Sequence, residues 1–326
     1  MRFIDPSYEI IPQEEGLLGV YKQIEKAART AYKSEDKIAE GSAQRMVESL
    51  CKSSHGACLE HGTIYLEVPM ENGDWVGICG DYDDNPYSIV KYVDYGDYMK
   101  AYITTNARVI FENGWEDDLK YMCEPTEFHE KRITVKFITS IGVVREILRH
   151  RKFSFLNEST RYCNYSKDKF GSELTFIIPQ WIYKMQEEES SSVDYLTGEV
   201  KDWIMNLSGE ILVNQLSCED RHVAAWMDCL ERCEEDYIYL TKDEEGYQLK
   251  AEEARGILPL DLKSELIVTG FISDWIHFFR LRSYIAATGK PHPDIQKLAD
   301  GLLYEFTKEG YCTLDEVKNE QIEECN

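Results

Sequence analysis

The sequence predicts an α+β fold with a mixed or antiparallel sheet, in which strands concentrate in the first half and helices in the second. Two segments, GTIYLEVPM at 62–70 and RITVKFITS at 132–140, have the β-branched and aromatic content typical of strands. Apolar residues recur at helical spacing over residues 16–52 and 195–235. Because 43% of the residues are hydrophobic, the chain can bury a large core, and we expect one domain over residues 1–326.

The other elements of the first half follow from local composition. Residues 71–130 begin with a run rich in Gly, Asp, Asn and Tyr, which indicates an insertion or an elaborated hairpin. We expect residues 101–114 to contribute a strand to it. The segment IGVVREILRHR, residues 141–151, continues the strand at 132–140 as a helix.

The second half is expected to be mainly helical. ELTFIIPQW at 173–181 is a strand by its composition, and residues 241–255 continue the helical pattern. Residues 261–287 are expected to form one long helix. The last helix begins near Pro291, since proline is tolerated in the first turn of a helix.

The charge balance excludes one broad class of function. The chain has 60 acidic and 36 basic residues, a formal net charge of -24. A non-specific nucleic-acid binder needs a broad basic surface, so we expect no nucleic-acid partner. No window approaches the roughly 18 uninterrupted apolar residues of a membrane span, and the start lacks the pattern of a signal peptide. We therefore expect a soluble cytoplasmic protein with reduced cysteines.

One group of histidines and cysteines invites a metal site. Cys51, His55, Cys58 and His61 lie close together in CKSSHGACLEHG. Four ligands crowded into one short turn hinder the tetrahedral closure of a zinc site, and the usual two separated ligand pairs are missing. We expect no metal here. The sequence also lacks a Gly-rich phosphate loop of the dinucleotide-binding or P-loop type.

The stretch RHRKFSFLNESTRY at 149–162 places three basic residues side by side in an acidic chain. Adjacent cations repel one another, so Arg149, His150 and Arg151 either spread into solvent or converge on an anion. In a helix over 143–151, Arg145 and Arg149 would share a face while Arg151 points elsewhere. The alternative is a solvated basic helix end.

The residues after this cluster are suited to reading a nucleotide. If the chain is extended beyond Phe155, then Asn157, Ser159 and Arg161 project to one side. An amide, a hydroxyl and a guanidinium on one edge could bind a phosphate and the edge of a base.

Two arginines far along the chain are also candidates. Arg282 follows Phe278, Trp275 and Phe271 at helical spacing, which places a guanidinium on an aromatic stripe. A buried guanidinium needs a partner, although an arginine can also extend over aromatic side chains to reach water. Arg255 is explained most simply by an ion pair with Glu252, three residues earlier.

Taken together, these segments resemble the flavin-dependent thymidylate synthases. The resemblance rests first on Arg149, His150 and Arg151 followed, after seven residues, by Ser159. Three further stretches occur in the order found in that family: SSHGACLEHG, AEEARGILPL, and FFRLR followed by PHPDIQKLA. They cover most of the chain outside residues 71–130.

The resemblance implies an FAD-dependent homotetramer with active sites between subunits. Such an enzyme methylates dUMP to dTMP, with methylenetetrahydrofolate as carbon donor and NADPH as reductant. It implies these residues at the flavin: His55, Arg149, His150, Arg151 and His277. It implies these residues at dUMP: Glu146, Asn157, Ser159, Thr160, Arg161, Arg255 and Arg282.

The resemblance also assigns individual roles. The catalytic residues would be Arg282, Ser159 and His55. Arg282 would face and polarise the uracil ring, and Arg161 and Arg255 would lie near the phosphate. Ser159 would be a ligand-binding hydroxyl rather than a nucleophile, since no base lies beside it in the sequence.

The sequence departs from the family pattern at several positions, and two other functions stay open. Phe271, Ser273 and His277 stand where some members present Asn or Arg to the flavin, and Asn157 stands where a longer carboxylate or amide is common. One alternative is a non-catalytic nucleotide or RNA-binding module, against which the retention of both Arg255 and Arg282 speaks. The other is a flavoenzyme that acts on a different pyrimidine nucleotide.

Overall fold

The computed structural model describes residues 1–70, 75–167, 173–189, 218–242, 248–285 and 289–319. Within these residues the centre of the molecule is a four-stranded antiparallel sheet in the order β2-β6-β9-β7. Its strands are β2 (Ser7–Ile11), β6 (Arg132–Ser140), β7 (Ser154–Asn157) and β9 (Lys263–Phe271). The antiparallel sheet and the helices around it confirm the predicted α+β class.

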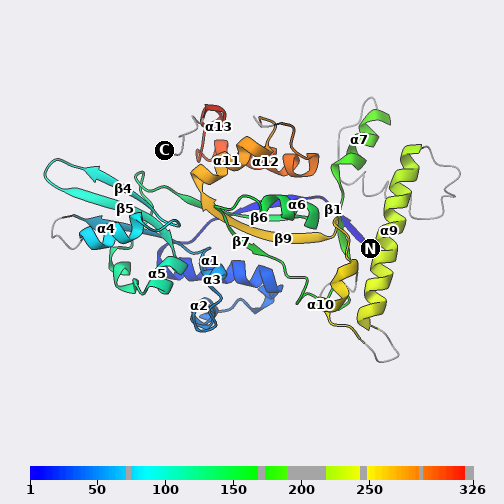
Figure 1. Cartoon of the computed structure of the whole chain (residues 1–326), viewed down its shortest axis with the longest axis horizontal. Helices are drawn as coiled ribbons and strands as arrows, with labels where there is room; N and C mark the ends of the chain where they lie inside the picture. The colour runs from blue at the N-terminus through cyan, green and yellow to red at the C-terminus, as the bar shows by residue number, and fades with distance from the viewer. Residues whose placement is uncertain (71–74, 168–172, 190–217, 243–247, 286–288, 320–326) are drawn as a thin grey trace.

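Helices cover both faces of the central sheet (Figure 1). Helices α11 (Ile272–Arg282), α12 (Pro293–Lys308) and α13 (Leu314–Asn319) lie on one side, and α1 (Gly16–Tyr32) lies on the other. Side chains alternate accordingly along β9. Leu266 and Val268 join the cluster under α11 and α12, whereas Ile267 packs against Ala27 of α1. This alternation with period two is what a strand buried on both faces requires.

A second, three-stranded antiparallel sheet lies at one end of the molecule, in the order β3-β5-β4 (Figure 1). Its strands are β3 (Thr63–Pro69), β4 (Ile89–Asp94) and β5 (Met99–Asn106). The helices of this part of the chain are α4 (Trp75–Asp83), α5 (Ala107–Asn113) and the 3-10 helix η2 (Glu116–Tyr121). The predicted strand over 101–114 is wrong in its second half. Asn106 ends the strand and caps α5, because its side-chain oxygen accepts a hydrogen bond from the backbone N–H of Val109 at 3.2 Å. That residues 71–130 form an insertion stays a prediction.

The remaining elements complete a third cluster and the connections. Strand β1 (Arg2–Ile4) pairs in parallel with β8 (Thr175–Ile177), beside the long helix α9 (Cys218–Lys242). The other elements are η1 (Glu35–Lys37), α2 (Ser42–Lys52), α3 (Gly56–Leu59), α6 (Ile141–Ile147), α7 (Gln180–Glu189), α10 (Ala251–Ala254) and η5 (Arg255–Ile257). None of the described helices is long and apolar enough to cross a membrane.

The expectation of one helix over 261–287 is wrong. Residues 263–271 form the inner strand β9, and the helix begins only at Ile272. The apolar run in SELIVTG is buried on both faces, and periodicity alone cannot tell such a strand from a buried helix. A carboxylate oxygen of Asp274 accepts from the backbone N–H of Phe271 at 3.3 Å and closes the start of the helix. Phe271 therefore lies outside the helical stripe, and a strand of the second half is central to the sheet.

Other boundaries differ by less. Helix α6 ends at Ile147, four residues before the expected end of the 141–151 helix. The strand expected at 173–181 is limited to β8. Within the described part of 241–255, the last two residues of α9, then α10 and the first residue of η5, are helical. The first part of the helix expected at 195–235 lies outside the described residues. The last long helix starts at Pro293 rather than at the expected Pro291, and Pro293 is the proline of its first turn.

Candidate active site

The structure brings Arg282, Glu146 and His150 into one hydrogen-bonded cluster. The Nη1 of Arg282 donates to Oε2 of Glu146 at 2.9 Å, and Nη2 donates to the Glu146 carbonyl at 3.3 Å. The Nε of Arg282 donates to Nε2 of His150 at 3.2 Å. Helix α6 follows β6 and helix α11 follows β9, so the two helices begin at opposite ends of this antiparallel strand pair. Both helices pack on the same face of the sheet, and their last turns therefore meet. Arg282 thus has the partner that its position on the aromatic stripe required.

His150 is held neutral in this cluster. Burial, helped by Arg282 and His277, lowers the pKa of His150 to about 4. Its ring lies edge-on to Phe278, with centroids 5.0 Å apart, and 6.5 Å from the ring of His277. A neutral ring that accepts at Nε2 carries its proton on Nδ1. His150 therefore orients Arg282 without adding a second charge beside it.

The lowered pKa of His150 predicts a pH-dependent stability. Between about pH 6.5, the ordinary histidine value, and about pH 4, the unfolded chain binds a proton at this ring and the folded chain does not. The free energy of unfolding should therefore fall as the pH falls through this window. In His150→Gln the slope should be shallower, by at most about 1.4 kcal/mol per pH unit. Urea unfolding of both proteins across this pH range measures the difference, and equal slopes would contradict a neutral His150.

Two adjoining cavities lie beside the cluster. They have volumes of about 450 and 350 Å³ and share Arg145 and Leu260 in their walls. The larger is also lined by Ser140, Gly142, Val143, Glu146, Arg149, Asp261, His292 and Asp294. The smaller is also lined by Ile141, Asn157, Glu158, Thr160, Arg255, Gly256, Leu258 and Ser264. Arg145 and Arg149 thus face one cavity even though the helix ends between them.

The extended chain expected after Phe155 ends earlier than the motif suggested. Strand β7 stops at Asn157, and residues 160–162 form a turn, so Asn157, Ser159 and Arg161 do not project to one side. The backbone N–H of Ser159 donates to the carbonyl of Ala31 at 3.1 Å. Among the residues lining the two cavities, Asn157 and Thr160 appear, whereas Ser159 and Arg161 do not.

The ion pair expected between Arg255 and Glu252 is replaced by another. The Nη2 of Arg161 lies 3.1 Å from Oε2 of Glu252, and the Arg161 guanidinium lies 5.4 Å from the centre of the Tyr162 ring. Both side chains of this pair are partly exposed. Arg255 instead lines the smaller cavity and carries no ion pair among the described residues. It is therefore available to an anionic ligand.

His55 lies apart from this cluster in the chain described. It precedes α3 as the N-cap residue, is exposed, and has its Nδ1 2.8 Å from Oγ of Ser53. Helix α3 packs on α1, α2, α5 and β7. Within the described residues no contact joins His55 to the cluster of Arg282, Glu146 and His150.

Exposed cations near the cluster could hold an anionic cofactor. Arg149 and Arg151 are exposed, and neither forms an ion pair within the described parts of the chain. His277, also exposed, lies next to the ring of His150. Free guanidiniums are the usual partners of phosphate oxygens, so this donor set fits a dinucleotide with a pyrophosphate group. The described residues contain no group of three His, Cys, Asp or Glu side chains that could hold a metal ion.

A buried network of lysines and glutamates lies beneath the smaller cavity, and it was not predicted. The Nζ of Lys263 lies 2.9 Å from carboxylate oxygens of both Glu158 and Glu265. Lys136 pairs with Glu265 at 2.6 Å, and Lys33 pairs with Glu265 as well. Lys33 also lies 3.9 Å from a carboxylate oxygen of Glu35, so the three lysines are matched by three carboxylates. These ion pairs lie beneath a cavity that Glu158 itself lines.

The lysines of this network favour the ionised form of the Glu265 carboxylate. Burial alone would raise the pKa of Glu265, but Lys263, Lys33 and Lys136 outweigh burial and hold it at about 2. Its contribution to stability is present above the ordinary value of 4.5 and is lost as the pH falls toward 2. Tyr165 donates to Glu158 at 3.0 Å, and Oγ of Ser264 donates to Oδ1 of Asn157 at 2.9 Å. The network therefore fixes the wall that carries Asn157.

Comparisons with known proteins identify the family. A family model described as thymidylate synthase complementing protein matches residues 117–309. The chain is 23% identical over 168 residues to a probable flavin-dependent thymidylate synthase of Paramecium bursaria Chlorella virus 1, covering 52% of this chain and 64% of that protein. It is 27% identical over 164 residues to the flavin-dependent thymidylate synthase of Synechocystis sp., covering 50% and 61%. The matched part spans less than two thirds of these relatives.

Solved structures of low identity also match. The UMP/dUMP methylase PolB from Streptomyces cacaoi, bound with 5-Br dUMP, is 18% identical with a TM-score of 0.41, and the match covers 94% of this chain and 93% of that one. Thymidylate synthase X from Helicobacter pylori, with FAD and dUMP, is 13% identical with a TM-score of 0.35, and the match covers 97% and 99%. Since the family model matches more than half of the sequence, the chain belongs to the thymidylate synthase complementing protein family.

Proposed function

We propose that this protein is a flavin-dependent thymidylate synthase, which methylates dUMP to dTMP with methylenetetrahydrofolate as carbon donor and NADPH as reductant. The observation that carries the proposal is the position of Arg282. Its guanidinium is fixed by Glu146 and His150, and Glu146 also lines the larger of the two cavities. A fixed cation at this place can polarise a uracil carbonyl and make the ring a better hydride acceptor.

The nucleotide would occupy the two cavities. Arg255 and Thr160 line the smaller cavity and would bind the phosphate, with Arg161 at its outer side. Asn157 would donate its amide to the nucleotide, since Ser264 already occupies its oxygen. The base would lie toward Glu146 and Arg282. Ser159 would act as a ligand-binding hydroxyl. Its own backbone N–H donates to the carbonyl of Ala31, and this bond would hold Ser159 in place.

The flavin would be held by the exposed cations beside this site. Arg149 and Arg151 would bind its phosphates, and His150 and His277 would lie at its ring. When bound, a flavin supplies hydride transfer between NADPH and the pyrimidine, and the protein supplies position and electrostatics. Because His55 lies apart from the cluster within one chain, we propose that it reaches the flavin of a neighbouring copy in a homotetramer. We propose the cytoplasm as the location of the protein, because the sequence shows neither a membrane-spanning window nor the pattern of a signal peptide.

The decisive experiment combines a spectrum with turnover. The purified protein should show flavin absorbance, should oxidise NADPH faster in the presence of dUMP, and should form dTMP when methylenetetrahydrofolate is added. A colourless protein that neither binds FAD nor responds to dUMP would overturn the proposal. Nucleotide binding without turnover would favour the binding module. Methylation of UMP or dCMP in preference to dUMP would favour the other flavoenzyme.

The flavin assignment makes a separate prediction. Arg149→Ala and Arg151→Ala should each lower FAD affinity by about tenfold or more, because each removes one charge-assisted hydrogen bond to a phosphate. Titration of FAD into the apoprotein, followed by fluorescence quenching, measures this. Arg232→Ala removes an exposed arginine on α9 and serves as the matched control. Equal FAD affinity in all three variants and the parent protein would contradict the assignment.

A further inference from the structure

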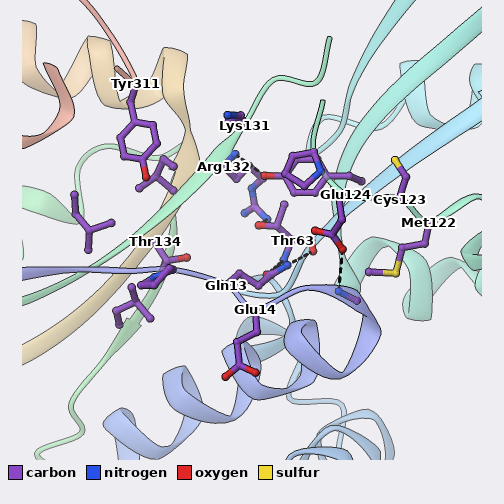
Figure 2. Close-up of a pocket in the computed structure, with 17 residues that line it drawn as sticks. Gln13, Glu14, Thr63, Met122, Cys123, Glu124, Lys131, Arg132, Thr134 and Tyr311 are labelled. Atoms are coloured by element: carbon purple, nitrogen blue, oxygen red, sulfur yellow. Dashed lines mark hydrogen bonds between the residues drawn. The ribbon is translucent and has the colours of Figure 1, made fainter. Parts of the chain in front are cut away.

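A third cavity lies between the central sheet and the three-stranded sheet (Figure 2). Its volume is about 230 Å³. The wall comes from the connection between β2 and α1, from β3, from the segment after η2 and from the start of β6. It shares no lining residue with the two cavities beside Arg282.

The central feature of this cavity is Arg132, a buried arginine without a carboxylate partner. Arg132 is only 8% exposed. Its Nη1 donates to the Glu60 carbonyl at 3.0 Å and to the Thr63 hydroxyl at 3.4 Å, and Nη2 donates to the Ser154 hydroxyl at 3.2 Å. All three acceptors are neutral, and Nε has no acceptor among the described residues.

The fold therefore leaves this guanidinium short of negative charge. Burial lowers the pKa of Arg132 to about 10, against the weaker opposing effects of Tyr65, Glu60 and Asp274. The Glu60 carboxylate is itself engaged by Arg108 at 2.6 Å. A buried cation that lacks a paired anion is costly, and an anion placed nearby would offset that cost.

The other charges of the wall strengthen this conclusion. Lys131 is exposed at the same wall and forms no ion pair within the described chain. Of the two carboxylates in the wall, Glu14 pairs with Lys22 at 2.5 Å, whereas Glu124 accepts from the neutral backbone N–H of Gly16 at 3.1 Å and keeps its charge. Lys131 and Arg132 together outweigh Glu124, so the wall keeps one positive charge in excess.

The rest of the wall combines apolar side chains with polar ones that are held by hydrogen bonds. Ile10, Ile133 and Met122 contribute apolar side chains. Gln13 is held in both directions, since its Nε2 donates to the Thr63 carbonyl and its Oε1 accepts from the Thr63 N–H, each at 2.8 Å. Figure 2 shows both of these bonds at the edge of the cavity.

We propose that this cavity binds a small organic acid, with its carboxylate toward Lys131 and Arg132 and its apolar part against Ile10, Ile133 and Met122. The volume is below the range of about 300 to 1,000 Å³ typical of drug-sized ligands, which restricts the ligand to a compact acid. Because the wall joins residues of both sheets, the bound acid would hold the two sheets together and raise the unfolding temperature.

Binding can be tested on the whole protein with acetate, 3-methylbutyrate and benzoate, followed by calorimetric titration and thermal unfolding. Chloride and inorganic phosphate at matched ionic strength control for general anion effects. At least one of the three acids should bind saturably and raise the unfolding temperature more than chloride does. Lys131→Ala should weaken that binding by about tenfold, because it removes a charge-assisted bond to the carboxylate.

Two further variants decide the outcome. Lys37→Ala removes an exposed lysine at a distant helix and should leave the affinity unchanged. Arg132→Lys keeps the charge but not the guanidinium, and should also weaken binding if it folds. The proposal is overturned if none of the three acids binds saturably, or if Lys131→Ala binds them as tightly as Lys37→Ala. The readout is binding, so its failure would not bear on the proposed synthase activity.

Discussion

Replacing Arg282 with alanine should lower kcat for dUMP methylation by about 100- to 1,000-fold while leaving the flavin bound. The guanidinium is fixed by His150 and by two oxygens of Glu146, so it is already oriented before substrate arrives. A preorganised cation of this kind stabilises negative charge that develops on a carbonyl during the reaction, and alanine removes all of that stabilisation. Single-turnover rates with saturating dUMP, together with the flavin spectrum, measure both parts of the prediction.

Two variants on neighbouring positions serve as controls. Arg280→Ala changes an arginine of the same helix whose Nε donates to the Val317 carbonyl at 2.9 Å, so it should affect stability more than kcat. Glu146→Gln should cost less than Arg282→Ala, because the Glu146 carbonyl and His150 still hold the guanidinium. If Arg282→Ala released the flavin, or lowered kcat no more than Arg280→Ala, Arg282 would not act on the pyrimidine.

The elements that were predicted correctly are those whose conformation is determined by the local pattern of residue types. The segment 132–140 is rich in β-branched residues and forms β6, as predicted. The strand at 263–271 was mistaken for a helix because its burial on both faces removes the alternation that distinguishes the two. Only its pairing with β6 and β7, which are distant in sequence, determines its conformation.

The candidate site shows the same division. Arg149, His150 and Arg151 are adjacent in sequence, so their grouping could be recognised from the motif. The bond between Arg282 and Glu146 joins residues 136 positions apart, and it depends on β6 and β9 pairing so that α6 and α11 meet. The chain alone suggests the residue types but not this contact.

The buried network was missed for a related reason. Lys33, Glu158 and Glu265 come from α1's end, the segment after β7, and β9, which no local pattern connects. In a chain with 60 acidic and 36 basic residues, nothing in the sequence distinguishes these three residues from charges on the surface. Their burial becomes visible only once α1 packs on β7 and β9.

Replacing Lys263 with methionine should lower the free energy of unfolding by about 3 to 5 kcal/mol, the usual cost of breaking a buried ion pair. Methionine matches the length of the lysine stem, but among the described residues it leaves Glu158, whose side chain is fully buried, with Lys33 at 3.8 Å as its one cation. The loss of Lys263 should also raise KM for dUMP, because the adjacent Ser264 holds Asn157 in the wall of the smaller cavity. Urea unfolding and steady-state kinetics measure the two effects.

A pair on the three-stranded sheet provides the matched control. Lys100 pairs with Glu67, but both side chains are about 30% exposed, so Lys100→Met should cost only about 0 to 1 kcal/mol. The double variant Glu158→Gln with Lys263→Met should recover part of the lost stability, since no unpaired carboxylate then remains in the interior. If Lys263→Met were no more destabilising than Lys100→Met, the charges beneath the smaller cavity would be accessible to water. In that case solvent would screen the ion pairs of the network, and they could not hold the wall of the smaller cavity in place.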